Sequence, residues 1–214
     1  LFVTKGAGDI IYTGKGNRYD PYDRLLLKPK VLVPKPLRFE IDERILIDGK
    51  IYKEIKTSEI NRLINRITNL NVKSVAIVLL HSYKNDYHEK LIKKLIRGKN
   101  KNIHISLSSE ICPEIGEFDR LNTTCSNAYI QPIAENYLSK LNNEIKEQNI
   151  NSDIKLIWSD GGTASLKDSI ANPIRLLESG PAGGALAISY LSKENKNRNA
   201  IAFDMGGTTA KASL

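Results

Sequence analysis

The chain has 214 residues, of which 41% are hydrophobic and 26% charged, with a formal net charge of +8; this length suffices for one large domain or two small ones, and no apolar run approaches the about 18 residues of a membrane span. The positive charge comes mostly from Lys scattered along the chain, without an accompanying cluster of aromatic residues and arginines, which favours a solvated basic surface over a nucleic-acid-binding module. The two cysteines, Cys112 and Cys125, are too few for a disulfide framework and lack metal-ligand spacing, so we expect reduced thiols and a cytoplasmic protein.

The N-terminal part of the chain begins with a glycine-rich loop region. Glycines surround DIIYTG at 9–14, which is a candidate strand. The prolines in LLLKPKVLVPKPLRFEI at 25–41 favour an extended or edge-strand connection. Residues 37–55 alternate apolar and polar on both sides of Asp48-Gly49, a dipeptide suited to a tight turn, and therefore predict a β-hairpin.

The next segment alternates helical and strand patterns. Apolar residues recur at helical spacing from Thr57, with Ser58 as the expected N-cap, and a continuous apolar run at 72–80 predicts a buried strand. A second helix is predicted at 86–97, followed by a strand in NIHISLS. Such an alternation is typical of an α/β layer.

The rest of the chain continues the alternation. A long helix is predicted at 119–148, bent near Pro132 because proline removes a backbone donor and clashes with the preceding turn. The strand IKLIW then leads into SDGG, a helix is predicted from near Pro181 to near Leu191, and the strand AIAFD leads into MGGTT. The chain opens without Met and stops within a strand pattern, so we expect a fragment of a longer protein.

The strongest chemical motif is FDMGGTTAKASL at 203–214, in which an apolar strand ends in an aspartate followed by two glycines and two threonines. Glycines allow a backbone to approach a phosphate closely, threonine hydroxyls add donors, and the carboxylate is suited to holding Mg²⁺ through water. The motif predicts a phosphate-binding hairpin, different from a Walker loop, with an ordinary tight turn as the alternative. The candidate residues are Asp204, Gly206, Gly207, Thr208 and Thr209.

Two further turns carry candidate ligand contacts. The SDGG turn follows a strand, at the place where open α/β folds bind ligands, although a structural turn explains it equally well. The SGPAGG segment precedes a helix, where small residues permit close approach and the helix N-terminus favours an anion; a packing role is the alternative. The candidate residues are Asp160, Gly161, Gly162, Ser179, Gly180, Gly183 and Gly184.

Together these segments resemble the family of hydantoinase A, 5-oxoprolinase and the acetone carboxylase β-subunit. The resemblance runs along essentially the whole chain, and the DMGGT and SGPAGG motifs are its most specific parts. The segments that carry it are VTKGAGDII near the start, DERILIDGKI at 42–51, SVAIVLLHSYKNDYHE at 74–89, SLSSEICPEIGEFDRLNTTCSNAYIQP at 106–132, WSDGG at 158–162, LLESGPAGG at 176–184 and FDMGGTT at 203–209.

The resemblance implies an α/β, actin-like ATPase fold of two ribonuclease-H-like halves, with ATP and Mg²⁺ held between phosphate-binding hairpins. This chain would cover the later part of the first half and the opening hairpin of the second, with 1–192 in the N-terminal-type domain and 193–214 starting the core domain. Asp204 would then act in catalysis by holding Mg²⁺ through water, and the neighbouring glycines and threonines would hold phosphate. Lys211 stands where many relatives carry Asp, which leaves the substrate class open.

The family's reaction, as the resemblance implies, is ATP-dependent opening of a cyclic amide such as hydantoin or 5-oxoproline through phosphoryl activation. Carboxylation of a ketone is the alternative within the family, a kinase is the alternative within the fold, and a non-catalytic scaffold of the same fold is the alternative of another class. The implied partners are a small cyclic-amide substrate and a hydantoinase B-type subunit or fused domain, with neither nucleic acid nor membrane.

Three further polar features leave alternatives open. In HSYKNDYHE, His81, His88 and Glu89 form either a metal site or a loop-capping and interface cluster. In GEFDR, Glu117, Asp119 and Arg120 resemble the family's acidic-then-arginine stretch, and they either face the nucleotide cleft or form a structural salt bridge. Cys125 lies on a predicted helix without a nearby His, so it is predicted to be a buried thiol rather than a nucleophile.

Overall fold

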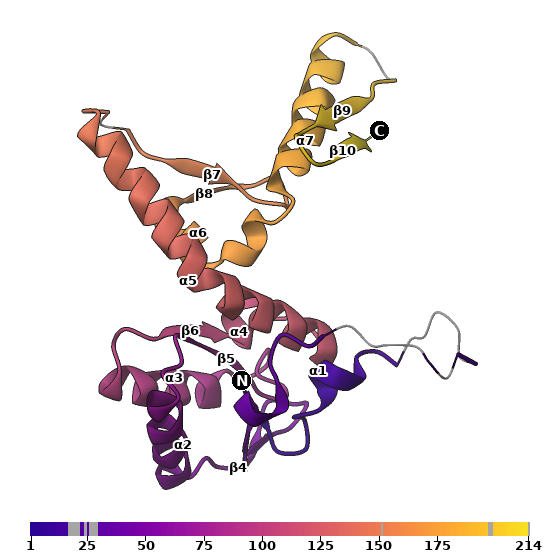
Figure 1. Ribbon diagram of the computed structural model, residues 1–214. Coiled ribbons are helices and arrows are strands. Elements are labelled where there is room, and N and C mark those ends of the chain that lie inside the picture. The colour runs from indigo at the N-terminus through magenta and orange to yellow at the C-terminus, as the bar shows by residue number, and fades with distance from the viewer. Residues whose placement is uncertain (17–21, 24, 26–29, 151, 197–198, 214) are drawn as a thin grey trace. The chain divides into compact units, whose positions relative to one another are not determined.

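The computed structural model describes residues 1–16, 22, 23, 25, 30–150, 152–196 and 199–213 (Figure 1). The chain forms two compact units, Leu1–Pro132 and Ile133–Leu214. Helix α5 (Glu117–Glu147) begins in the first unit and ends in the second, which confirms the predicted long helix. Pro132 lies inside this helix, and the predicted bend there stays a prediction.

A parallel four-stranded sheet of order β2-β1-β5-β6 forms the centre of the first unit. Strand β5, predicted from the apolar run at 72–80, is a central strand with Val75 and Ile77 on one face and Ala76 and Val78 on the other. A central parallel strand is covered on both faces, which is why its sequence is continuously apolar. The strands are β1 (Phe2–Thr4), β2 (Phe39–Ile41), β5 (Ser74–Val78) and β6 (His104–Leu107).

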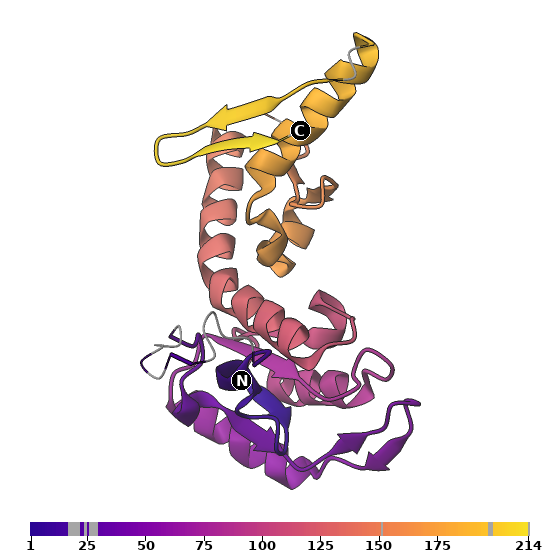
Figure 2. The same ribbon diagram turned by 90° about the vertical axis from the view of Figure 1, so that its right-hand side faces the viewer.

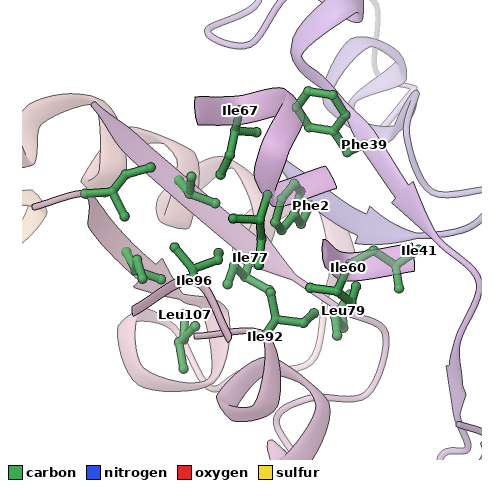
Figure 3. Packing of buried hydrophobic residues seen from close by; sticks show 14 of the residues in the cluster. Phe2, Phe39, Ile41, Ile60, Ile67, Ile77, Leu79, Ile92, Ile96 and Leu107 are labelled. Atoms are coloured by element: carbon green, nitrogen blue, oxygen red, sulfur yellow. The ribbon is translucent and has the colours of Figure 1, made fainter. Parts of the chain in front are cut away.

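Helices cover both faces of this sheet. Helices α2 (Thr57–Asn69) and α3 (Tyr87–Lys99) pack on one face, and α1 (Ile10–Thr13) and the start of α5 pack on the other. Figure 3 shows the larger core, in which isoleucines from both helices meet the sheet, each worth about 2 kcal/mol when fully buried. This core includes Phe2, Phe39, Ile41, Ile60, Ile64, Ile67, Ile77, Leu79, Ile92, Ile96 and Leu107.

The predicted hairpin around Asp48-Gly49 is confirmed in part. Strands β3 (Arg44–Ile45) and β4 (Ile51–Lys53) pair antiparallel, and Gly49 has a φ of +85°. The first part of the 37–55 pattern does not belong to the hairpin, because β2 pairs with β1 at the edge of the main sheet. This edge position agrees with the expected edge strand; a short helix, η1 (Lys35–Leu37), precedes it, and residues 26–29 of that stretch lie outside the described part.

Two predictions of local structure are wrong. The DIIYTG segment is helix α1 rather than a strand, because Thr13 N–H bonds Asp9 C=O and the two isoleucines fit the core beneath a helical turn. Helix α2 begins at Thr57 after Lys56, so Ser58 lies inside the helix and is not its N-cap.

Among its described residues, the second unit contains two antiparallel hairpins and three helices besides the end of α5. Strands β7 and β8 form one hairpin and β9 and β10 the other, and helix α7 begins two residues before the predicted start at Pro181. None of the described helices has the length and apolar content needed to cross a bilayer. The elements are β7 (Lys155–Ile157), β8 (Thr163–Ser165), α6 (Leu166–Ala171), η2 (Pro173–Leu176), α7 (Ser179–Glu194), β9 (Ala202–Met205) and β10 (Ala210–Ser213); in the first unit α4 (Ser108–Ile111) follows β6.

Candidate phosphate-binding site

The MGGTT motif forms the turn of the β9–β10 hairpin. Asp204 lies opposite Lys211 in the strand register, and Gly206 N–H donates to Thr209 C=O at 3.0 Å across the loop. The loop residues Gly206, Gly207, Thr208 and Thr209 are all exposed. The hairpin geometry is as the sequence predicts, and its loop is accessible to a ligand.

Nothing in the described structure requires glycine at the two glycine positions of this loop. Neither Gly206 nor Gly207 has a positive φ, a Cβ at Gly207 would meet nothing within 4 Å, and a Cβ at Gly206 would meet only Thr209 O at 3.9 Å. A glycine in such a place costs conformational entropy that an alanine would not. The loop therefore keeps an open, Cβ-free backbone surface that its own fold does not need.

The SDGG turn is built differently. Gly161 has a φ of +84°, and a Cβ there would overlap Leu186 of helix α7. The Asp160 carboxylate accepts from Gly162 N–H at 2.9 Å and lies 3.4 Å from Arg175, whose guanidinium stacks on the Trp158 ring at 4.7 Å from its centroid. These contacts give the turn a structural role; its contact with a ligand stays a prediction.

The SGPAGG segment forms the first turns of helix α7. Ser179 is the first helical residue, and a Cβ at Gly180 or Gly184 would meet nothing within 4 Å. A Cβ at Gly183 would lie 3.5 Å from Ile157, an ordinary packing distance. Glycines inside a helix cost about 1 kcal/mol each relative to alanine, so the open positions again have no compensating contact in the described structure.

Helix α7 brings the predicted motifs together within the second unit. Strand β9 packs against α7, as Figure 2 shows for the yellow hairpin beside the helix. The Lys211 ammonium forms an ion pair with Glu178, the residue before α7, and Gly161 faces Leu186 on the same helix. Sequence reasoning treated Lys211 only as a departure from the family and did not identify Glu178 as its partner, since the two are 33 positions apart.

Asp204 suits a magnesium ion only through water. Its carboxylate is exposed at the end of β9, and the described residues contain no group of three or more His, Cys, Asp or Glu side chains that could hold a metal. Mg²⁺ often keeps several waters and takes its remaining ligands from one or two carboxylates and from phosphate oxygens. A single exposed carboxylate beside the candidate phosphate-binding loop fits that mode of binding.

In the HSYKNDYHE cluster, His88 and Glu89 have structural partners, and His81, with a φ of 56°, has its Nδ1 3.3 Å from the Tyr83 hydroxyl. His88 is fully buried and its Nδ1 lies 2.7 Å from the Glu43 carboxylate, while its Nε2 lies 3.3 Å from Glu54. Burial alone would lower the pKa of His88, but hydrogen bonds from the imidazole to both carboxylates outweigh it and raise the pKa. Glu89 accepts four hydrogen bonds, from Leu79 N–H, Ser108 Oγ–H and the Ser109 N–H and Oγ–H, so its oxygens are satisfied without a metal.

Arg120 and Cys125 are buried in the first unit. The Arg120 guanidinium donates to Ser82 Oγ at 2.7 Å and to Leu79 C=O at 2.9 Å, so its role is to join α5 to the end of β5. The neighbouring Asp119 forms an ion pair with Lys15 at 2.8 Å, so the salt-bridge alternative holds for Asp119, whereas Arg120 bonds a hydroxyl and a carbonyl; a cleft-facing role of this stretch stays a prediction. Burial raises the pKa of the Cys125 thiol to about 12, which confirms a buried thiol rather than a nucleophile.

Two family models match the chain. The model described as the hydantoinase/oxoprolinase N-terminal region matches residues 1–99, and the model described as hydantoinase/oxoprolinase matches residues 120–214. The chain belongs to the hydantoinase/oxoprolinase family. The resemblance inferred from the DMGGT and SGPAGG motifs is thereby confirmed.

Similar proteins confirm the fold. An uncharacterized protein of Methanocaldococcus jannaschii is 38% identical over 213 residues, and caprolactamase subunit alpha of Pseudomonas jessenii is 27% identical over 216; each alignment covers 100% of this chain and 31% of the relative. The solved nucleotide-free structure of acetone carboxylase, from work on ATP-dependent acetone carboxylation, superposes with a TM-score of 0.84 at 26% identity, over 100% of this chain and 31% of that one. The α/β, actin-like ATPase fold is therefore confirmed, and the chain spans about a third of these relatives.

Proposed function

We propose that this chain supplies a phosphate-binding hairpin to an enzyme that uses ATP to open a cyclic amide. Three features support the proposal: membership of the hydantoinase/oxoprolinase family, a relative named caprolactamase, and the similar structure of acetone carboxylase, a protein described as carrying out an ATP-dependent reaction. Residues 1–192 would belong to the N-terminal-type domain and 193–214 to the start of the core domain.

The observation that carries the proposal is the contrast between glycines. Gly161 is needed by its own turn, whereas Gly206 and Gly207 are free of any such need and lie on an exposed loop. Backbone without Cβ atoms allows a phosphate to approach the amide N–H groups closely. Thr208 and Thr209 add hydroxyl donors at the same loop.

Each residue of the hairpin has a proposed role. When bound, MgATP supplies the phosphoryl group that activates the amide carbonyl towards water. The loop amides and threonine hydroxyls would hold phosphate oxygens, and Asp204 would hold the ion through water, so that positioning and charge neutralisation do most of the work. Ser179, Gly180, Gly183 and Gly184 at the start of α7, and Asp160, Gly161 and Gly162 in the SDGG turn, would line the nucleotide side of the site.

Carboxylation of a ketone is the second candidate. The superposition on the acetone carboxylase structure supports it, because that protein is named for an ATP-dependent carboxylation. A non-catalytic scaffold is the candidate of another class, and the intact GGTT loop speaks against it. The name of the caprolactamase relative, a subunit alpha, supports a hetero-oligomer in which a second subunit or fused domain completes the enzyme.

Magnesium-dependent ATP hydrolysis by the whole gene product, assayed together with its partner subunit, tests the proposal. Stimulation by hydantoin, 5-oxoproline or caprolactam is the expected result, whereas stimulation by acetone with bicarbonate would favour the carboxylase. Asp204→Ala is expected to abolish hydrolysis without changing the circular dichroism spectrum, and Asp153→Ala, at an exposed aspartate of the same unit, is the matched control. Wild-type turnover by Asp204→Ala would overturn the role of Asp204, and absence of nucleotide binding would favour the scaffold.

A further inference from the structure

Lys211 joins the phosphate hairpin to helix α7. Its ammonium pairs with the Glu178 carboxylate, and its position in the strand register is directly opposite Asp204. Side chains of directly opposed residues in an antiparallel pair lie on the same face of the hairpin. The hairpin therefore presents Lys211 and the proposed magnesium-binding carboxylate to one side, and Glu178 meets it there.

Glu178 has a backbone conformation that is unusual for its residue type. Its φ of 60° and ψ of 17° lie in the left-handed region, which non-glycine residues adopt at an energetic cost. It occupies the N-cap position of α7, yet its side chain makes no capping hydrogen bond to the helix. The carboxylate is thus used for contact with the hairpin rather than for capping its own helix.

We propose that Lys211 and Glu178 are positioning residues that hold the GGTT loop beside the glycine-rich start of α7, so that both face one nucleotide phosphate group. The inference rests on the proposed function, since it assigns a task to the same loop. Both side chains are partly exposed, at 38% and 71%, so solvent screens the pair. Such a pair contributes little to the stability of a unit, but it selects one position of a hairpin whose strand residues Phe203 and Met205 are exposed.

The proposal predicts a specific pattern of kinetics. Lys211→Gln and Glu178→Gln should each raise the KM for MgATP by up to about fivefold, the loss that an exposed ion pair can cause, while kcat stays near the wild-type value. Higher salt should raise the wild-type KM towards that of the variants, because it screens the pair. The charge exchange Lys211→Glu with Glu178→Lys should recover most of the wild-type KM.

The experiment measures KM and kcat for MgATP in the whole gene product with its partner subunit, together with amide hydrogen exchange of residues 202–205 and 210–213 without nucleotide. Lys167→Gln, an exposed lysine on α6, is the matched control and should change neither quantity. We expect faster amide hydrogen exchange in the hairpin of both single variants. In the double variant Lys211→Glu with Glu178→Lys, the hydrogen exchange should slow again towards the wild-type rate.

A higher KM for Lys211→Gln with wild-type behaviour of Glu178→Gln would overturn the proposal, since Lys211 would then contact phosphate by itself. The proposal would also be overturned if the double variant Lys211→Glu with Glu178→Lys recovered neither the wild-type KM nor the slow amide hydrogen exchange of the hairpin, or only one of them. If the wild-type protein does not bind MgATP, the proposed function fails separately. In that case, unchanged amide hydrogen exchange of the hairpin in both single variants would also reject the positioning role of the Lys211–Glu178 pair, and faster hydrogen exchange would retain it.

Discussion

Gly161 is the residue whose replacement should most directly disturb the second unit. Its positive φ disfavours any residue with a Cβ, and the added methyl would overlap Leu186. We expect Gly161→Ala to lower the free energy of unfolding by about 2 kcal/mol, measured by urea denaturation. Adding Leu186→Ala should recover the part due to overlap and leave the part due to φ; full recovery would mean that the backbone conformation carries no cost.

His88 should make the stability of the first unit depend on pH. Its pKa is raised in the folded protein, so the folded state binds more protons than the unfolded state between the unfolded value of about 6.5 and the raised value. This contribution is fully present below pH 6.5 and is lost as the pH rises through the folded pKa. The free energy of unfolding of wild type should therefore fall more between pH 6 and pH 9 than that of His88→Gln.

The same variant separates the charge of His88 from its packing. His88→Gln removes one partner of the buried Glu43 carboxylate and is expected to cost about 3 kcal/mol at pH 6. The cost should shrink as the pH rises through the folded pKa of His88, because wild type then loses the charged pair. Parallel pH curves for the two proteins would contradict the role of this histidine.

At the scale of elements, the candidate phosphate-binding hairpin permits a test that separates folding from ligand binding. A methyl group at Gly207 would meet nothing in the described structure and requires no unusual φ. Gly207→Ala should therefore leave thermal unfolding unchanged while weakening MgATP binding at least about tenfold, because the methyl occupies the space that a phosphate needs. Isothermal titration calorimetry and a melting curve measure the two effects, and wild-type affinity in the variant would show that the loop does not hold phosphate.

The elements that the sequence predicted share one property, which is a strong local pattern. The 3.6-residue spacing of Ile60, Ile64 and Ile67 and the unbroken run in β5 identified α2 and the buried strand. The glycine pair of MGGTT located the turn of the β9–β10 hairpin, whereas SDGG predicted a turn after β7 but not the strand β8 that pairs with it. Helix α1 was missed because two β-branched isoleucines favour a strand over a helix of only four residues. Helix α6 had a usable signal, the Ser165 to Asp168 capping pair, which the structure shows as a hydrogen bond from Asp168 N–H to Ser165 Oγ.

Contacts between distant segments explain what sequence reasoning missed at the candidate site. Periodicity gives the face of a helix but not its neighbour, so neither the Glu178 to Lys211 pair nor the approach of Gly161 to Leu186 follows from local pattern. The family resemblance supplied the candidate residues, and the structure then separated Gly161, which its own turn requires, from Gly206 and Gly207, which it does not. Their part in binding stays a prediction.

At the scale of the whole molecule, the two units differ in how much apolar surface they bury. Both buried hydrophobic clusters lie in the first unit, whereas the second exposes Leu186, Tyr190, Phe203 and Met205. The 214-residue chain alone should therefore show slow amide exchange in β5 and β6 and fast exchange in β7 to β10. Equal protection in the two units, measured by mass spectrometry, would contradict this expectation.

Helix α5 prevents either unit from being separated cleanly as a domain of its own. The boundary between the units falls at Pro132, inside one continuous helix rather than in a linker. A chain ended there would keep Leu121, Cys125 and Ala128, which close the smaller core, but would leave the last carbonyls of the shortened helix without partners. A chain begun at Ile133 would lose the preceding turns that its own segment of the helix continues. Exchange of domains between relatives therefore has to keep α5 whole, together with the smaller core that its first turns close, and not divide the chain at the boundary between the two compact units.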